Sequence, residues 1–231
     1  MQRSRVLAIV AAILVIAGVV VFQLTAQPAP TLESQQQRVS YAIGLNLGRS
    51  LASQKITADV DLLARGIRDG LGGASLLDDK QIQETMETFE KDMRAQRTAS
   101  GEKNQTAGAA FLAENGKRPS VKTTASGLQY EILTAGDGPK PAATDRVRVH
   151  YRGTLVDGTE FDSSYQRGEP AVFPANRVIP GWTEALQLMA VGSKWKLFIP
   201  PALGYGDQGA GAAIPPQATL IFEVELLGIE Q

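Results

Sequence analysis

Apolar residues in the first part of the chain recur every three or four positions, which is the spacing of one face of an α-helix. Between residues 32 and 73 they form two stripes, first at Val39, Ile43, Leu47 and Leu51 and then at Leu63, Ile67 and Leu71. This periodicity predicts two helices, and Gly72-Gly73 is a typical helix end. Because helices this short bury little area alone, we expect the stripes to pack against a partner, such as a second copy of the same segment.

A longer helix is predicted over residues 79–115. Asp78 is a favourable N-cap, and Gln81 lies three residues later, as in a capping box. An Asn-Gly pair and then Pro119 end the pattern. Residues 78–118 are therefore expected to form a long helix that connects two parts of the chain.

The polarity of this helix changes along its length. Its first part carries an apolar stripe at Ile82, Met86, Phe89 and Met93, and residues 94–106 are polar. A helix that is polar all round is typical of a stalk that crosses solvent. Gly101 and Gly108 lower helix propensity by roughly 1 kcal/mol each, so they predict a local break.

From residue 120 onward the apolar period changes to two, which indicates half-buried antiparallel strands. Alternation of this kind surrounds Tyr130, Tyr151, Trp195 and Phe222, while residues 181–189 keep a helical spacing. The pattern predicts an α+β domain, a twisted antiparallel sheet wrapped on one short helix. Alternation places Tyr151, Trp195 and Phe222 on the helix-covered face and His150 on the opposite face, as a surface residue. Trp182, at the start of the short helix, is either the floor of a pocket or an ordinary core residue.

The N-terminus has a different character. Arg3 and Arg5 precede an apolar run at residues 6–22, about 25 Å long as a helix at ~1.5 Å per residue. We favour an uncleaved anchor in the inner membrane, with its positive end inside, over a cleaved signal peptide, because residues 24–26 form a poor cleavage site. Either alternative places the remainder outside the cytoplasm. The expected division is residues 1–27 for the signal segment, 28–77 for an all-helical dimerisation region, 78–118 for the connecting helix and 119–231 for the sheet domain.

The amino-acid composition limits the kinds of functional site that this chain can form. A net charge of −1 gives no reason to expect nucleic-acid binding. With no cysteine and one histidine, thiol nucleophiles, disulfides, His-based metal sites and catalytic triads are not expected, and neither is a cofactor. The last third instead gathers aromatic residues around one carboxylate and one phenol. Such a site suits a substrate whose chemistry is the rotation of a bond, as in proline isomerisation.

Four segments carry a specific resemblance: VHYRG at 149–153, GTEFDSS at 158–164, VIPGW at 178–182 and IPPQATL at 214–220. In order and spacing they resemble the signature of the FKBP-type peptidyl-prolyl cis-trans isomerases, over about residues 125–229. Residues 111–115 and 123–130 are similar to bacterial envelope members of the macrophage infectivity potentiator type. That resemblance implies a periplasmic homodimer formed through residues 32–93, with macrolides as inhibitors and unfolded, proline-containing polypeptides as substrates.

Carried over position by position, the resemblance implies a set of site residues. The catalytic residues would be Tyr151, Phe161, Asp162, Trp182, Tyr205 and Phe222, and the substrate-binding residues Phe173, Val178, Ile179, Ile214 and Arg167. Two departures concern substrate preference: Ala171 replaces a bulky aromatic of many members, and Ala210 and Ala213 make the flap at residues 206–216 small and apolar.

Desolvation in an aromatic pocket would accelerate the rotation of an X–Pro bond without covalent or metal chemistry. Two other functions stay open at this point. One is a holdase chaperone whose helical arms grip clients while isomerisation is secondary. The other is an inactive binding module that kept the fold, against which the complete pocket set argues.

Overall fold

The computed structural model describes residues 31–230. The expected signal segment at 1–27, with its anchor at 6–22, lies outside these residues. Among the residues described, no helix is both long and apolar enough to cross a membrane.

Two helices form where the apolar stripes predict them. Helix α2 spans Gln35–Ser53 and helix α3 spans Val60–Gly72. Asp59 caps α3 by accepting hydrogen bonds from the backbone N–H groups of Asp61 and Leu62, and Gly73 ends it at a φ of 72°. Most of the two stripes is exposed in the described chain, and Ile43 is 65% and Leu71 87% exposed.

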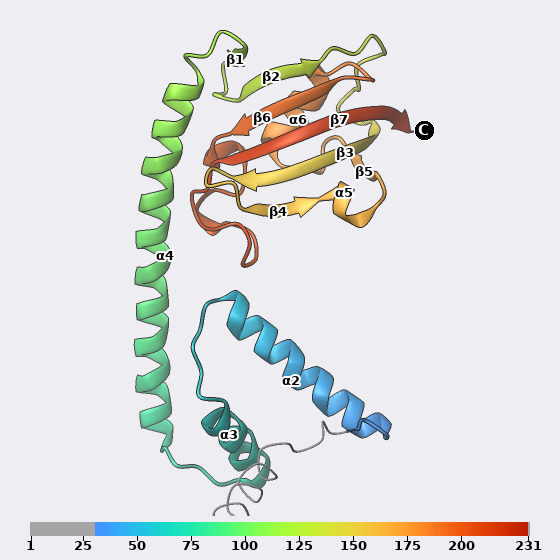
Figure 1. The fold of residues 1–231 in the computed structure, drawn as a ribbon. Helices are drawn as coiled ribbons and strands as arrows, with labels where there is room; N and C mark the ends of the chain where they lie inside the picture. Colours follow the sequence, from blue (N-terminus) through green and yellow to red (C-terminus); the bar gives the residue numbers. More distant parts are fainter. Residues whose placement is uncertain (1–30, 231) are drawn as a thin grey trace, which may run out of the picture. The chain divides into compact units, whose positions relative to one another are not determined.

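Helix α4, Asp79–Asn115, is one uninterrupted helix (Figure 1). Its N-terminus has the predicted capping box, in which Asp78 and Gln81 exchange side-chain and backbone hydrogen bonds. The expected break at Gly101 and Gly108 is therefore wrong. Both glycines are buried against the sheet domain. The expectation of a stalk exposed to solvent through residue 106 holds for residues 94–99 and is wrong for one face beyond them, where Gly101 and Asn104 contact the sheet domain.

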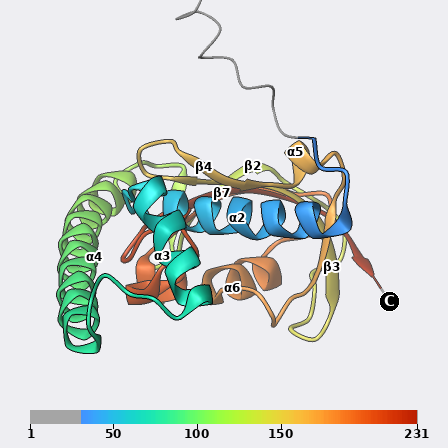
Figure 2. The ribbon, with the colours of Figure 1, turned by 90° about the horizontal axis from the view of Figure 1, so that it is seen from below.

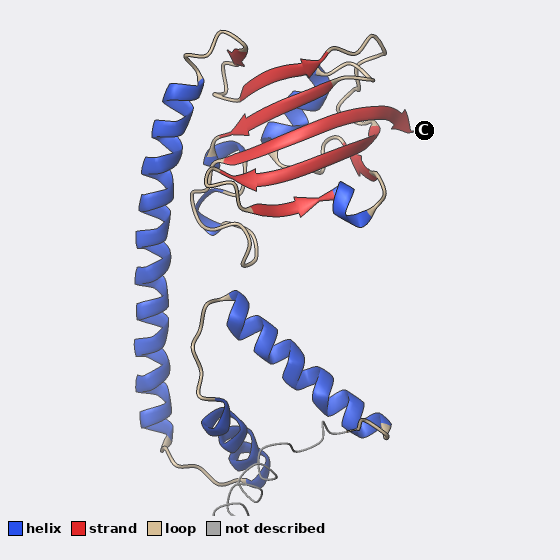
Figure 3. Cartoon of the chain, in the orientation of Figure 1, coloured by secondary structure: helices blue, strands red, loops and turns tan. Residues whose placement is uncertain are grey.

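One antiparallel sheet dominates the remainder (Figures 1 and 3). Its seven described strands are β1 Val121–Thr123, β2 Gln129–Thr134, β3 Arg146–Leu155, β4 Glu160–Ser163, β5 Ala171–Pro174, β6 Lys194–Ile199 and β7 Leu220–Glu230. The order is β1-β2-β6-β7-β3-β4, and β5 pairs with the first half of β3. The long β3–β7 ladder forms the middle of the sheet and runs from Arg146 opposite Glu230 to Leu155 opposite Leu220.

Helix α6, Pro180–Leu188, covers one face of this sheet (Figures 1 and 2). Pro180 occupies the first helical position, where its missing N–H costs nothing. Gly181 lets the helix approach β6, since a Cβ there would lie 2.7 Å from Ile199 Cγ2. The core between helix and sheet includes Trp182 and Leu186. The predicted α+β class, a sheet wrapped on one short helix, is confirmed. Three short elements, α5 (Ser164–Arg167), η1 (Pro201–Leu203) and η2 (Gly206–Gln208), connect strands.

The alternation predicted for the strands is confirmed in the core. Tyr151, Trp195 and Phe222 are each 5% exposed and belong to one cluster. His150 faces away from that cluster: its Nδ1 lies 3.0 Å from Ser164 Oγ, and its ring stacks on Tyr165. His150 is half-buried rather than a freely exposed surface residue.

Candidate functional site

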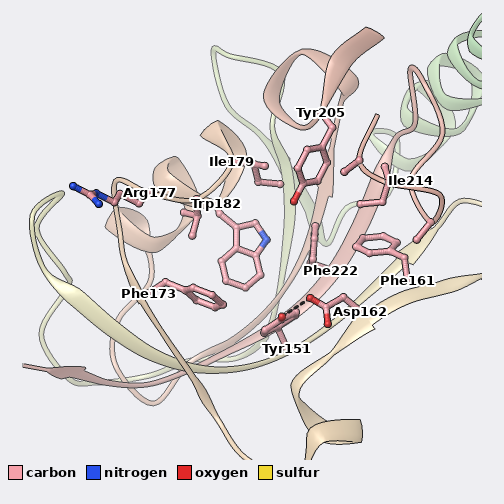
Figure 4. A pocket seen from close by; sticks show the side chains of 13 residues that line it. Tyr151, Phe161, Asp162, Phe173, Arg177, Ile179, Trp182, Tyr205, Ile214 and Phe222 are labelled. Atoms are coloured by element: carbon pink, nitrogen blue, oxygen red, sulfur yellow. Dashed lines mark hydrogen bonds between the residues drawn. The ribbon is translucent and has the colours of Figure 1, made fainter. Parts of the chain in front are cut away.

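A cavity of about 410 Å³ lies on the helix-covered face of the sheet (Figure 4). Its walls come from β3, β4, β5, β7, the start of α6, the segment between β5 and α6, and the loop between β6 and β7. The lining residues are Tyr151, Phe161, Asp162, Phe173, Arg177, Val178, Ile179, Trp182, Tyr205, Ala210, Ala213, Ile214 and Phe222. Pockets of this volume that are mostly apolar with a few polar groups are typical of small-ligand sites.

Trp182 forms the centre of an aromatic cluster. Its ring centroid lies 5.2 Å from that of Tyr151 and 5.2 Å from that of Phe222, both nearly perpendicular to it. Phe173 contacts it edge-on at 6.0 Å. These are favourable aromatic geometries, worth about 1 kcal/mol each beyond the buried area. Trp182 is 4% exposed, so it is at once a core residue and a wall of the cavity.

A glycine makes room for two of these rings. Gly153 faces Phe222 across the β3–β7 ladder. A Cβ at this position would lie 2.6 Å from Phe161 and 2.7 Å from Phe222. Any other residue would displace the rings, so the match of this glycine to the VHYRG segment has a direct steric reason.

Asp162, Tyr151 and Arg167 form a polar corner. Tyr151 donates its hydroxyl hydrogen to Asp162 Oδ2 at 2.5 Å, as the dashed line in Figure 4 marks. Arg167 donates to Asp162 Oδ1 at 2.5 Å and to the Tyr151 hydroxyl at 2.7 Å, and its guanidinium lies 5.3 Å from the Tyr151 ring centroid. Because both charged side chains are almost half exposed, the ion pair orients groups more than it stabilises the fold.

This corner keeps its charges over a wide pH range. Burial raises the pKa of the Tyr151 hydroxyl, and the hydrogen bond to Asp162 raises it further. Burial alone would raise the pKa of Asp162, but hydrogen bonds from Tyr151 and Arg167 outweigh it and lower that pKa below 3.8. The stability that comes from ionised Asp162 is therefore present above about pH 3.8 and is lost as the pH falls through the lowered pKa.

The rim of the cavity contains polar groups that face an open mouth. Tyr205 is 40% exposed, and its hydroxyl has no hydrogen-bond partner among the described residues. Ile179, the residue before α6, lies beside Tyr205, and Ile214 closes the side near Phe161 (Figure 4). A peptide could therefore reach both a hydroxyl and a backbone position at the mouth.

Every site residue predicted from the sequence lines this cavity except Arg167, which contacts it through Tyr151 and Asp162. Arg177 also lines the cavity and was not predicted. Its guanidinium extends away from the aromatic cluster in Figure 4. The only signal in the sequence was its place one residue before the VIPGW segment. Ala171 lies two residues before Phe173 on β5, opposite Val149 of β3.

Family models and individual relatives both match this chain to FKBP-type isomerases. Residues 36–132 match the family described as the domain amino terminal to FKBP-type peptidyl-prolyl isomerase, and residues 138–227 match the family FKBP-type peptidyl-prolyl cis-trans isomerase. The FKBP-type isomerase FkpA of Aeromonas hydrophila is 46% identical over 215 residues, with 88% of this chain and 80% of that protein covered. The outer membrane protein MIP of Legionella longbeachae is 43% identical over 213 residues, with 90% and 91% covered.

Solved structures are similar as well. The crystal structure of FkpA from Escherichia coli matches with a TM-score of 0.61 and 40% identity, covering 87% of this chain and 99% of the other. A peptidyl-prolyl isomerase from Pseudomonas syringae matches 56% of this chain and 96% of its own length, with a TM-score of 0.53 and 45% identity.

Proposed function

Because this chain belongs to the FKBP-type peptidyl-prolyl cis-trans isomerases, we propose that its cavity under α6 is where the X–Pro bond rotates. The chain is a peptidyl-prolyl cis-trans isomerase, and the resemblance inferred from the sequence is confirmed. One observation supports the cavity assignment above the others. Side chains that lie between residues 151 and 222 converge on one mostly apolar space beside a single carboxylate.

The proposed mechanism uses desolvation. The barrier of about 20 kcal/mol to X–Pro rotation comes from amide resonance, which makes the planar amide polar. At the twisted transition state the resonance is lost and the carbonyl becomes less polar. An aromatic pocket around Trp182 solvates the planar amide less well than water does, so it favours the twisted amide relative to the planar one. The rotation itself needs no proton transfer and no covalent bond to the protein.

Each polar group at the rim has a positioning role in this proposal. The Tyr205 hydroxyl and the backbone N–H of Ile179 would donate hydrogen bonds to carbonyls that flank the proline. Asp162, ionised and fixed by Tyr151 and Arg167, would accept polar C–H or N–H contacts from the substrate. Phe161, Phe173, Val178, Ile214 and Phe222 would enclose the proline ring and its preceding side chain.

We also propose an organisation for the whole chain. Residues 119–231 form the isomerase domain, residues 78–118 connect it, and residues 32–93 join two copies into a homodimer. The uncovered apolar stripes on α2 and α3 support the last point. Residues 6–22 would hold the dimer at the inner membrane on its periplasmic side, with a cleaved signal peptide as the alternative. The substrates would be unfolded envelope proteins, and macrolides would inhibit by filling the cavity.

Substitutions in the cavity test its assignment. Trp182→Ala should lower kcat/KM on a short X–Pro peptide by about tenfold or more, because it removes the central wall, and Asp162→Ala should lower it less. Tyr205→Phe should lower it about fivefold, the value of one hydrogen bond. Tyr165→Phe is the matched control, since Tyr165 is 45% exposed and bonds Glu225 outside the cavity. If all three cavity variants kept wild-type kcat/KM while folded by circular dichroism, the cavity would not be the site.

A further inference from the structure

One wall of the cavity is a loop that is weakly held by its own contacts. The structure divides the flap expected at residues 206–216 into two parts. From here on, flap means residues 205–214, and residues 215–219 are called its foot. The flap gives Tyr205, Ala210, Ala213 and Ile214 to the cavity. Its internal hydrogen bonds include the pair between Ala210 and Ile214, at 2.8 and 3.1 Å, and one from Gly209 N–H to the Tyr205 carbonyl at 3.2 Å. Because its alanines offer little apolar area, the order of the flap depends on what holds its ends.

The foot is conformationally restricted. Pro215 and Pro216 fix two successive φ angles. Gln217 follows with a φ of 55°, which is unusual for a residue with a side chain, and its N–H donates to the Gly206 carbonyl at 2.8 Å. Because these φ angles are restricted, we expect a displacement of the foot to move Ile214 as well.

Helix α4 docks against this foot. Asn104 donates its side-chain amide to the Pro216 carbonyl at 2.9 Å, across 112 positions of sequence. One turn later Gly108 lies against Thr219, so closely that a Cβ would come within 2.2 Å of Thr219 Oγ1. Thr219 is 2% exposed, and its hydroxyl has no hydrogen-bond partner among the described residues. The contact between α4 and the foot therefore depends on the close approach at Gly108 and on one directional hydrogen bond, from Asn104.

We propose that Asn104 and Gly108 are positioning residues for isomerisation: by docking the foot, they hold the Tyr205 and Ile214 side chains of the flap at the cavity. This inference rests on the cavity assignment of the proposed function. It extends the machinery of the reaction into a helix that contributes no side chain to the cavity. Loosening the foot should weaken substrate binding, because a disordered flap must be ordered each time a peptide binds.

Hydrogen exchange on the full-length protein tests the hydrogen bond. Asn104→Ala should raise exchange about fivefold at the Ala210 and Ile214 amides, which corresponds to about 1 kcal/mol for one net hydrogen bond. Core amides of β3 and β7 should not change. KM for an X–Pro peptide should rise severalfold, with kcat less affected. Gln105→Ala is the matched control, because it removes a neighbouring exposed amide that makes no hydrogen bond to the foot.

A pair of glycine substitutions tests the close approach. Gly108→Ala should raise flap exchange and KM, although alanine favours a helix over glycine. Gly101→Ala is its control, since a Cβ there would meet Pro216 Cβ at 3.4 Å and Gln217 Cγ at 3.7 Å, which are ordinary contacts. Adding Thr219→Ala to Gly108→Ala removes the atom that clashes and should restore much of the wild-type KM.

The outcomes separate this inference from the proposed function. Selective exchange at the flap together with a raised KM supports it. Unchanged flap exchange in both Asn104→Ala and Gly108→Ala overturns it, and so does a uniform rise over flap and core, which would mean that α4 stabilises the domain only as a whole. If instead Trp182→Ala kept full activity, the cavity assignment would fail, whatever the flap exchange showed.

Discussion

In α4 the apolar half of the helix is exposed and the polar half is docked, which is the reverse of what hydrophobic burial alone would predict. The first half carries an apolar stripe, yet Ile82 is 42% exposed and Phe89 is 38% exposed. The second half is polar in sequence and contains two glycines, yet it is the half that docks on the sheet domain. Its contacting positions, Gly101, Asn104, Gly108, Phe111 and Asn115, repeat at the spacing of one helix face.

The difference separates two kinds of interface. In the second half, small residues and amides allow close approach, and one aromatic contact adds buried area, with Phe111 lying 5.9 Å from Phe198 between centroids. In the first half, the larger apolar side chains Ile82, Met86 and Phe89 stay between 38% and 49% exposed among the described residues. The contact made by the second half of α4 is therefore one within a single chain. The exposed apolar stripe of the first half is what we expect of a surface that a second chain covers.

The largest expected effect is the difference in melting temperature when the first half of α4, or the whole helix, is removed. Fragment 94–231 should melt near the temperature of the isomerase domain in the full chain, because it keeps every residue of α4 that docks on that domain. Fragment 119–231 should still fold, but melt at least about 10 °C lower, since it loses the Phe111 packing and the hydrogen bonds at Asn115, together about 2 kcal/mol or more. Calorimetry of both fragments measures this.

Equal melting temperatures for the two fragments would contradict the docking. A loss already present in 94–231 would place a structural role in the first half of α4 and remove the contrast between the halves.

The second prediction concerns association. Light scattering should give twice the chain mass for residues 28–231 and a monomer for 94–231. Ile82→Asp in the longer fragment should weaken association about 100-fold, because it places a charge in a buried apolar contact. Glu84→Lys changes charge on the same helix turn at a residue whose side chain is 63% exposed, and it should leave the dimer intact. A monomeric 28–231 would refute the assignment of residues 32–93 as the dimer region.

Much of this architecture could be predicted from the sequence because it depends on local patterns. The capping box at Asp78 and Gln81, the glycine end at Gly73 and the period-two strands all follow from neighbouring residues. The site residues could be carried over because the matching segments are contiguous. Their convergence around Trp182 agrees with that transfer, and their catalytic roles stay predictions.

The errors concern glycine and long-range contact. Gly101 and Gly108 predict a break when only helix propensity is considered. The structure shows both glycines inside one continuous helix, and at Gly108 the missing side chain is what allows the close approach to Thr219. Nothing near Asn104 in the sequence indicates the Pro216 carbonyl, which lies 112 positions away. Short elements such as β1 and β4 were also not predicted, because three or four residues carry too little periodicity.

The third prediction is a division of labour between the halves. A single pocket binds one X–Pro unit weakly, whereas two joined pockets raise the effective concentration of a long unfolded client. Fragment 94–231 should therefore turn over a tetrapeptide at nearly the full-length rate, but catalyse refolding of a proline-limited protein about tenfold less well. Equal loss on both substrates would mean that the first half supports the pocket directly. Equal activity on both would mean that the arms do not contribute to client handling.

The fourth prediction, with the smallest expected effect, compares the stability contributed by one hydrogen-bonded pair in each half of α4. Gln83 donates to Glu87 at 2.8 Å on the exposed half, and Asn115 donates to Gln129 at 2.9 Å in the buried contact, where Gln129 also donates to the Leu112 carbonyl. Gln83→Ala should change the free energy of unfolding by a few tenths of a kcal/mol at most. Gln129→Ala should cost about 1 kcal/mol or more, because it leaves the Asn115 amide buried without its partner. Urea denaturation of the two variants in fragment 28–231 measures both, and equal costs would mean that water reaches the docked end of α4 as freely as its exposed end.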